Sequence, residues 1–203
     1  TEEAQKTAKH LIRFRHDDLL LDEDVREGDL FPEILLINSH DGWSSYQLRA
    51  GIFRLVCGNG MVVSEEEFGT IRICHRGFEE DEVREASQVF TENAVNLNQC
   101  VNEWRTVKLN DASKMSFSRQ AAKLRFESPG SDLVDALLVP HRPEDNDSSL
   151  WSVFNRVQEN LLQGGFLNED TRRRVRPITA IKKNVNINSG LWSIASKYNR
   201  SLN

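Results

Sequence analysis

Four arginines lie within five positions near the carboxyl end of the chain, at Arg172, Arg173, Arg174 and Arg176. A guanidinium is always charged, and its donors match the oxygens of phosphate and carboxylate groups. The surrounding segment has no apolar period, so a solvated loop is its ordinary interpretation. Four like charges are nevertheless costly to keep together unless something anionic is near. Contact with phosphates is therefore the function that we favour for this cluster.

A second pair of arginines occurs near the start of the chain, where Lys9–His16 alternates between apolar and basic residues. Alternation of this kind predicts a strand with one basic face. Arg13 and Arg15 are two residues apart and share that face. Their spacing suits two successive phosphates, or alternatively two acidic side chains.

The turn-rich stretch that follows the apolar run 34–37 holds a third group, namely Asn38, His40, Asp41 and Trp43. Ser39–Asp41 are consecutive and cannot form a Ser-His-Asp relay, whose members must converge from separate places. Asn38, His40 and Asp41 could contribute to a metal site with His16 or His75, although turn hydrogen bonds explain these residue types more simply. An exposed Trp43 beside His40 could stack on a base or on a partner surface.

A dense set of polar residues lies beside the apolar stripe of the predicted helix Leu150–Gln163. The functional interpretation is a hydrogen-bonding surface for a ligand or a neighbouring subunit. The alternative, which we favour slightly, is a buried network that ties the helix to the sheet loops, because amides near a core must be paired. The residues concerned are Asn155, Arg156, Gln158, Glu159 and Asn160.

The elements that must position these groups begin with the stretch Ile34–Val63, which predicts three antiparallel strands. Ser39–Ser44 should close the first hairpin. Asn59-Gly60 should close the second as a type I′ turn, whose central residues need positive φ. Gly51 lies in the middle strand, where a glycine predicts a bulge and a shift of phase. Two further strands, at Lys9–His16 and Gly69–Arg76, are compatible with the same antiparallel sheet.

From Phe78 to Trp104 the apolar residues recur every three or four positions, which predicts one long amphipathic helix with an acidic first turn. Pro177–Val185 predicts a last strand, and Asn188 should cap a final helix. Other helices are predicted at Ala112–Phe126, Ser131–Leu138 and Leu150–Gln163, the last closed by Gly164-Gly165.

Four segments together resemble one protein family. They are KHLIRFRH at 9–16, NSHDGWSSYQLRAGIFRLVCGNGMVV at 38–63, LWSVFNRVQENLLQGG at 150–165 and NSGLWSIASKY at 188–198. The chain resembles, over nearly its whole length, the phage/plasmid-like family catalogued as domain of unknown function 932. The resemblance implies a phage, plasmid or integrated element as the source and implies little about activity.

Composition indicates an ordinary globular protein: 38% of the 203 residues are hydrophobic and 28% are charged. No apolar stretch is long enough to span a membrane. Three cysteines without a C-x-x-C pair predict reduced thiols and a cytoplasmic location. The chain begins at Thr1, and we expect part of the natural amino terminus to be missing.

Charge is distributed unevenly along the chain. Residues 1–149 hold 17 Lys+Arg against 28 Asp+Glu, whereas residues 150–203 hold 9 against 3, which gives net charges of −11 and +6. The asymmetry predicts either an anionic partner for the basic end or attraction between the two ends, within the chain or between subunits.

These observations predict a single α+β domain over residues 1–203, in which a curved antiparallel β-meander packs against the long helix and residues 150–203 form a basic helical part. The leading hypothesis is a non-enzymatic nucleic-acid-binding protein that acts on single-stranded DNA, with annealing in recombination as one possibility, and that forms homo-oligomers. No cofactor or bound metal is expected. The alternatives are a protein that binds and modulates a host defence or recombination complex, and a metal-dependent enzyme built on His40 and Asp41.

Overall fold

The computed structural model describes residues 9–15, 30–39, 46–54, 59–62, 70–73, 96–97, 99–168 and 171–202. The chain divides into two compact units, 1–98 and 99–203. The described strands of the first unit and the helices of the second confirm the predicted α+β class.

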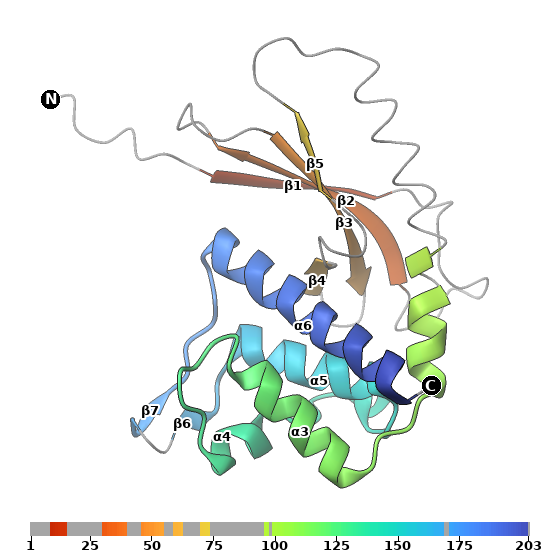
Figure 1. The fold of residues 1–203 in the computed structure, drawn as a ribbon. Helices are drawn as coiled ribbons and strands as arrows, with labels where there is room; N and C mark the ends of the chain where they lie inside the picture. Colours follow the sequence, from red (N-terminus) through yellow and green to blue (C-terminus); the bar gives the residue numbers. More distant parts are fainter. Residues whose placement is uncertain are drawn as a thin grey trace, which may run out of the picture. The chain divides into compact units, whose positions relative to one another are not determined.

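The first unit contains a five-stranded antiparallel sheet, in which β2 and β3 bend along their length (Figure 1). Strands β1 to β4 are neighbours in sequence order, and β5 pairs with β3. The strands are β1 (Lys9–Arg15), β2 (Leu30–Ser39), β3 (Tyr46–Arg54), β4 (Asn59–Val62) and β5 (Thr70–Ile73). The predicted long helix falls mainly outside the described residues, and its described part is helical at 96–97 and 99–106.

The register of β3 corrects two predictions. Asn59 and Gly60 do not form the hairpin turn, because they pair with Arg54 and Phe53 inside the ladder, so the connection spans residues 55–58. Gly51 is not a bulge, because the pairing of β3 with β2 continues through it without a break, opposite Glu33. The glycine instead marks the point where the other edge of β3 changes its partner from β5 to β4.

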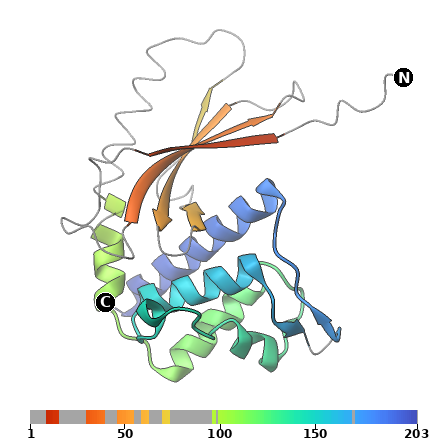
Figure 2. The ribbon, with the colours of Figure 1, turned by 180° about the vertical axis from the view of Figure 1, so that it is seen from behind.

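The second unit is a helical bundle in which α3 (Asp111–Ala122), α5 (Leu150–Gln163) and α6 (Ile181–Leu202) lie side by side (Figure 1, Figure 2). Two short helical turns, α4 (Ser131–Ala136) and a 3₁₀ turn at Pro143–Asp145, connect α3 to α5. The core of the bundle is an aromatic cluster whose ring centroids are 4.5 to 6.4 Å apart. Its members are Trp104, Trp151, Phe154 and Trp192.

The boundaries of α5 agree with the prediction because local signals fix both ends. The Ser149 side chain accepts a hydrogen bond from the backbone N–H of Ser152, and Gly164 follows the helix with φ of 65°. Within the described residues, no helix combines the length and the apolar character that crossing a bilayer requires.

The prediction for residues 177–188 is wrong. Helix α6 begins at Ile181, so 181–185 are helical rather than a strand, and Asn188 lies inside the helix rather than at its cap. Burial explains the difference: Val185, Asn188 and Trp192 are all less than 5% exposed and follow one another at helical spacing. The packing of this face outweighs the strand preference of the β-branched residues.

Candidate nucleic-acid interface

The arginine cluster lies on a β-hairpin that projects from one corner of the helical bundle (Figure 1, Figure 2). Strands β6 (Leu167–Asn168) and β7 (Arg173–Arg174) form the hairpin, in which Leu167 pairs with Arg174 and Asn168 with Arg173. Next to the paired strands, before β6 and after β7, the Val175 N–H donates to the Phe166 carbonyl over 2.9 Å. At the tip, the Asn168 side chain accepts from the Thr171 N–H over 3.1 Å.

Gly164 allows the base of the hairpin to pack tightly. Its φ of 65° lies in the left-handed region, and a Cβ at this position would lie 2.5 Å from the Val175 carbonyl oxygen. Only glycine fits such a position, because any side chain would meet both backbone strain and a steric clash. The neighbouring Gly165 has φ of 89° with no atom within 4 Å of its would-be Cβ, and its N–H donates to the same Val175 oxygen.

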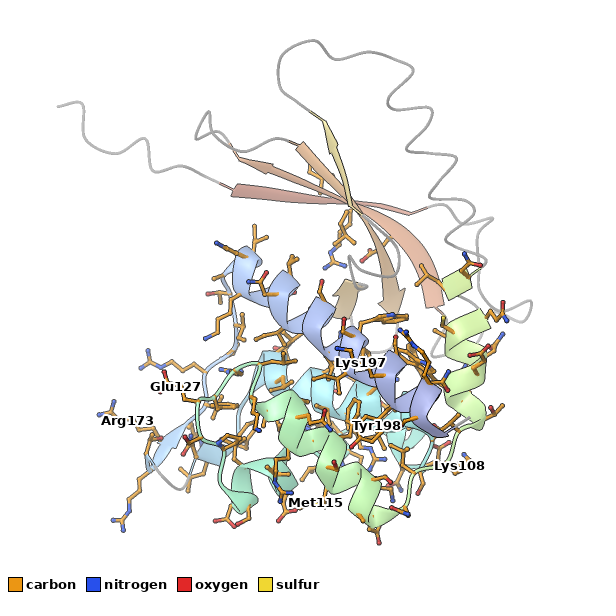
Figure 3. The ribbon with its side chains drawn as sticks, viewed as in Figure 1. Lys108, Met115, Glu127, Arg173, Lys197 and Tyr198 are labelled. Carbon is orange, nitrogen blue, oxygen red and sulfur yellow. The ribbon has the colours of Figure 1, made fainter. Side chains whose placement is uncertain are left out.

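The four arginines Arg172–Arg174 and Arg176 are all exposed, and Figure 3 shows Arg173 extending away from the helices. No carboxylate among the described residues forms an ion pair with any of them; Glu169 and Asp170 are not among those residues. Arg172 has φ of 51°, a left-handed conformation that is uncommon for a residue with a side chain.

Arg125 holds the exit of the hairpin in place. It follows α3, and its guanidinium donates to the carbonyls of Leu161, at the end of α5, and of Arg176, at the end of the arginine cluster. The same group lies 5.4 Å from the centre of the Phe126 ring. Burial lowers the pKa of Arg125. Its hydrogen bonds therefore fix the direction in which the hairpin leaves the bundle.

Helix α6 continues the basic character of the hairpin. The segment between them is fastened by a 2.8 Å hydrogen bond from the Ile178 N–H to the Leu162 carbonyl. The first turn of α6 holds the exposed Lys182 and Lys183 and no acidic residue. Residues 99–203 carry 16 Lys+Arg against 11 Asp+Glu, a net charge of +5 within a chain of net charge −5.

The polar set on α5 is directed into the bundle. Asn160, which is 2% exposed, shows this most clearly. Its amide donates to the carbonyls of Leu137, Val139 and Arg156 over 2.9 to 3.1 Å, and its oxygen lies 2.7 Å from Nε2 of His141. The nitrogen of the Asn160 amide is the donor in these bonds, and its oxygen can only accept. The His141 ring must therefore donate to that oxygen. Asn160 therefore fastens the loop that follows α4 to α5.

Arg156 fastens the next part of the same loop. Its guanidinium donates to the Asp147 carbonyl over 2.6 Å and to the Leu138 carbonyl over 3.4 Å. Burial lowers the pKa of Arg156, and the charges of Asp145 and Asp147 oppose that effect. Burial by itself would raise the pKa of Asp147, but hydrogen bonds from Ser149 and Ser152 and the charge of Lys108 outweigh it and lower the pKa to about 2.

The remaining members of the set bridge α5 to other segments. Gln158 donates to Asn188 of α6 over 2.8 Å, and Glu159 forms a 2.9 Å ion pair with Arg142. Asn155 donates to the Trp151 carbonyl, and its own buried oxygen has no hydrogen-bond partner among the described residues. The set thus forms a network inside the second unit, where it ties α5 to a loop and to α6.

In the first unit, Arg13 donates to the carboxylate of Glu33, a residue that is 0% exposed. Arg15 pairs with Glu33 in the strand register, so Arg13 and Glu33 are diagonal neighbours on adjacent strands. Glu33 is an acidic partner of the kind that the sequence suggests as one use of Arg13. Arg15 and Asn38 lie in β1 and β2, whereas His40, Asp41 and Trp43 lie outside the described residues.

The sequence matches one family over residues 4–192, and the family's description is "Domain of unknown function (DUF932)". The chain belongs to this family. It is similar to the UPF0380 proteins YafZ and YfjQ of Escherichia coli (strain K12), each 31% identical over 191 residues, which cover 92% of this chain and 67% of each relative. No solved structure matches the chain.

For this DUF932 chain, the described residues contain no group of three or more His, Cys, Asp or Glu that could hold a metal ion. The sequence pattern indicates the hairpin arginines but does not by itself indicate Lys182, Lys183 and Arg125. The two lysines could have been found, because no acidic residue occurs from residue 171 onward. No sequence pattern indicates that Arg125 contacts the carbonyl of Arg176.

Proposed function

We propose that this protein binds nucleic acid without catalysis, through contacts of the β6–β7 hairpin with phosphate groups. One observation carries the proposal: four exposed arginines lie on a projecting hairpin, and no described carboxylate pairs with them. Their mutual repulsion is unfavourable in the free protein and is relieved when phosphates approach. Release of counterions from the nucleic acid supplies most of the affinity in such complexes.

The first turn of α6 supports the same proposal. A helix dipole favours acidic residues at this end, and a lysine there is unfavourable by about 0.3–1 kcal/mol. Lys182 and Lys183 nevertheless occupy it. The unfavourable interaction disappears if a bound phosphate lies nearby, so the lysines extend the proposed phosphate-binding surface beyond the hairpin.

We further propose a setting in recombination of a phage, plasmid or integrated element, where the protein assists annealing of single DNA strands. The resemblance of the four sequence segments to a phage/plasmid-like family supports this setting. In the same proposal the protein is cytoplasmic and forms homo-oligomers.

The test measures the fluorescence anisotropy of labelled single-stranded and duplex DNA with the full chain, at low and high salt. Binding should weaken steeply as salt rises, because each phosphate contact contributes about −0.9 to the slope of log K against log salt on duplex DNA. The combined change of Arg172, Arg173 and Arg174 to Glu should weaken binding by about tenfold or more.

The matched control changes Arg119, Lys123 and Lys197 to Glu. All three are exposed and lie outside the hairpin, so the control alters the net charge by the same amount. An equal loss of affinity in both variants would show that overall charge, and not the hairpin, determines binding. No binding to any nucleic acid at low salt would contradict the proposal and favour a protein partner.

A further inference from the structure

The two arginines of β7 extend to opposite faces of the hairpin. Arg173 and Arg174 are consecutive residues of one extended strand, and successive side chains of a strand alternate between its faces. The register agrees: Arg174 is opposite Leu167, and Arg173 is opposite Asn168. Residues directly opposite in an antiparallel pair share a face. Each face of the ribbon therefore carries one exposed guanidinium.

We infer that the β6–β7 hairpin enters the major groove of double-stranded DNA, where phosphate strands lie on both sides of it. The inference rests on the proposed nucleic-acid binding and adds the form of nucleic acid. A hairpin that lay flat against a single strand of nucleic acid would need positive charges only on the face turned towards that strand. Neighbouring strands are about 4.8 Å apart, and the major groove, about 12 Å wide, accepts a two-stranded ribbon, whereas the minor groove, about 6 Å wide, is too narrow.

The other side chains of the second unit favour the duplex over a single strand. Sequence-independent binding of single strands uses exposed aromatic rings on which bases stack. None of the described aromatic side chains in 99–203 is exposed, and the tryptophans Trp104, Trp151 and Trp192 are at most 5% exposed.

Two contacts fix the base of the hairpin. Gly164 lets its base pack against Val175, and Arg125 fixes its exit at Arg176. A binding element that is ordered before it meets its ligand loses less conformational entropy on binding. Preference for the duplex also agrees with the proposed annealing, because a protein that binds the product more tightly than the separate strands shifts hybridisation towards the product.

The experiment compares the affinity of the full chain for duplex DNA, for each of its component strands and for duplex RNA of the same sequence. Duplex DNA should bind most tightly, since the major groove of A-form RNA is too narrow for side chains to enter. Arg173→Gln and Arg174→Gln should each weaken duplex binding by about threefold to tenfold and reduce the salt slope by about 0.9. Lys197→Gln, which removes an equal charge from α6, is the control and should leave the affinity nearly unchanged.

Arg174 also donates to the Gly165 carbonyl over 3.1 Å, so its loss could disturb the hairpin itself. Arg174→Lys keeps the charge without the fixed guanidinium geometry and should recover most of the duplex affinity. Equal or tighter binding to single strands, equal binding to duplex RNA, or an effect of only one of the two arginines would overturn the inference while leaving phosphate binding intact. Loss of all nucleic-acid binding in the unaltered chain would overturn both.

Discussion

At the scale of single residues, side chains of the same chemical type serve different purposes in this molecule. Arg156 and Arg125 are hydrogen-bonded to backbone carbonyls and hold segments together, whereas Arg172 and Arg173 extend into solvent. The difference lies in the carbonyl groups that surround each guanidinium, because a partly buried arginine is stable only where its donors are paired. Exposure and pairing together therefore identify the arginines that are available to a ligand.

Arg172→Gly should separate stability from binding. Glycine removes the strain of a left-handed φ, and the greater freedom of the unfolded chain offsets that gain, so the free energy of unfolding should change by less than about 0.5 kcal/mol. DNA affinity should fall as one charge is lost. Arg173→Gly is the control: it removes the same charge from an extended residue and should lower stability by about 1 kcal/mol. Denaturant unfolding and anisotropy on both variants test this, and a large loss of stability in Arg172→Gly would contradict it.

The pKa of Asp147 gives a pH dependence with a definite sign. Its folded pKa of about 2 lies below the ordinary value of 3.8, so the charged form stabilises the fold. That contribution is complete above pH 4 and disappears as the pH falls from about 4 to about 2. The loss should be modest, because the carboxylate is more than half exposed. Asp147→Asn should lack this part of the acid transition when melting temperature is measured against pH; identical profiles for the two proteins would contradict the assignment.

At the scale of elements, the hairpin depends on one glycine. Gly164→Ala places a Cβ 2.5 Å from the Val175 carbonyl oxygen in a left-handed backbone, and should lower the free energy of unfolding by about 2–3 kcal/mol. Gly165→Ala meets the same kind of backbone strain without a clash, and should cost about 1–2 kcal/mol. Urea unfolding of both variants measures the difference. Equal losses would show that the close approach to Val175 is not what requires glycine.

The elements also show which features can be predicted from sequence. Helix α5 is predicted correctly because Ser149 and Gly164 act locally at its two ends. The amino-terminal part of α6 is not predicted, because Asn188 resembles a cap yet lies inside the helix and is hydrogen-bonded to Gln158 of α5. The prediction for the connection between β3 and β4 is also wrong. An Asn-Gly pair favours a turn, but here the ladder of β3 and β4 continues through both residues. A contact distant in sequence therefore decides the case of α6, whereas strand pairing between near neighbours decides the case of the β3–β4 connection.

The candidate site shows the same division. The exposed arginines of the hairpin follow from their spacing alone, since a charged cluster without apolar period is expected on the surface. The partner of Arg13 cannot be predicted from spacing, because Glu33 is 20 residues away and reaches Arg13 only when β1 and β2 pair. Pairing of Arg125 with the hairpin likewise depends on how α3 and α5 pack.

At the scale of the whole molecule, the second unit has a core of its own. Trp104, Trp151, Phe154 and Trp192 all lie within residues 99–203 and pack on one another. We expect the fragment 99–203 to fold by itself, with a cooperative thermal transition and the blue-shifted fluorescence of buried tryptophan. A fragment that melts gradually and emits like solvent-exposed indole would show that the first unit is needed for this core. The same fragment should retain binding to duplex DNA, because the hairpin and α6 are both part of it.

Arg125 gives the molecule one further property. Its guanidinium joins the end of α5 to the exit of the hairpin, so movement of one segment relative to the other breaks at least one of the two hydrogen bonds. A bound ligand that restrains the hairpin must therefore also oppose local opening at the end of α5. Backbone amides around residues 161–165 should exchange their hydrogens more slowly in the complex than in the free protein, even where no ligand atom contacts them. Hydrogen exchange of amides inside the helical bundle would then report the binding of a ligand at the hairpin.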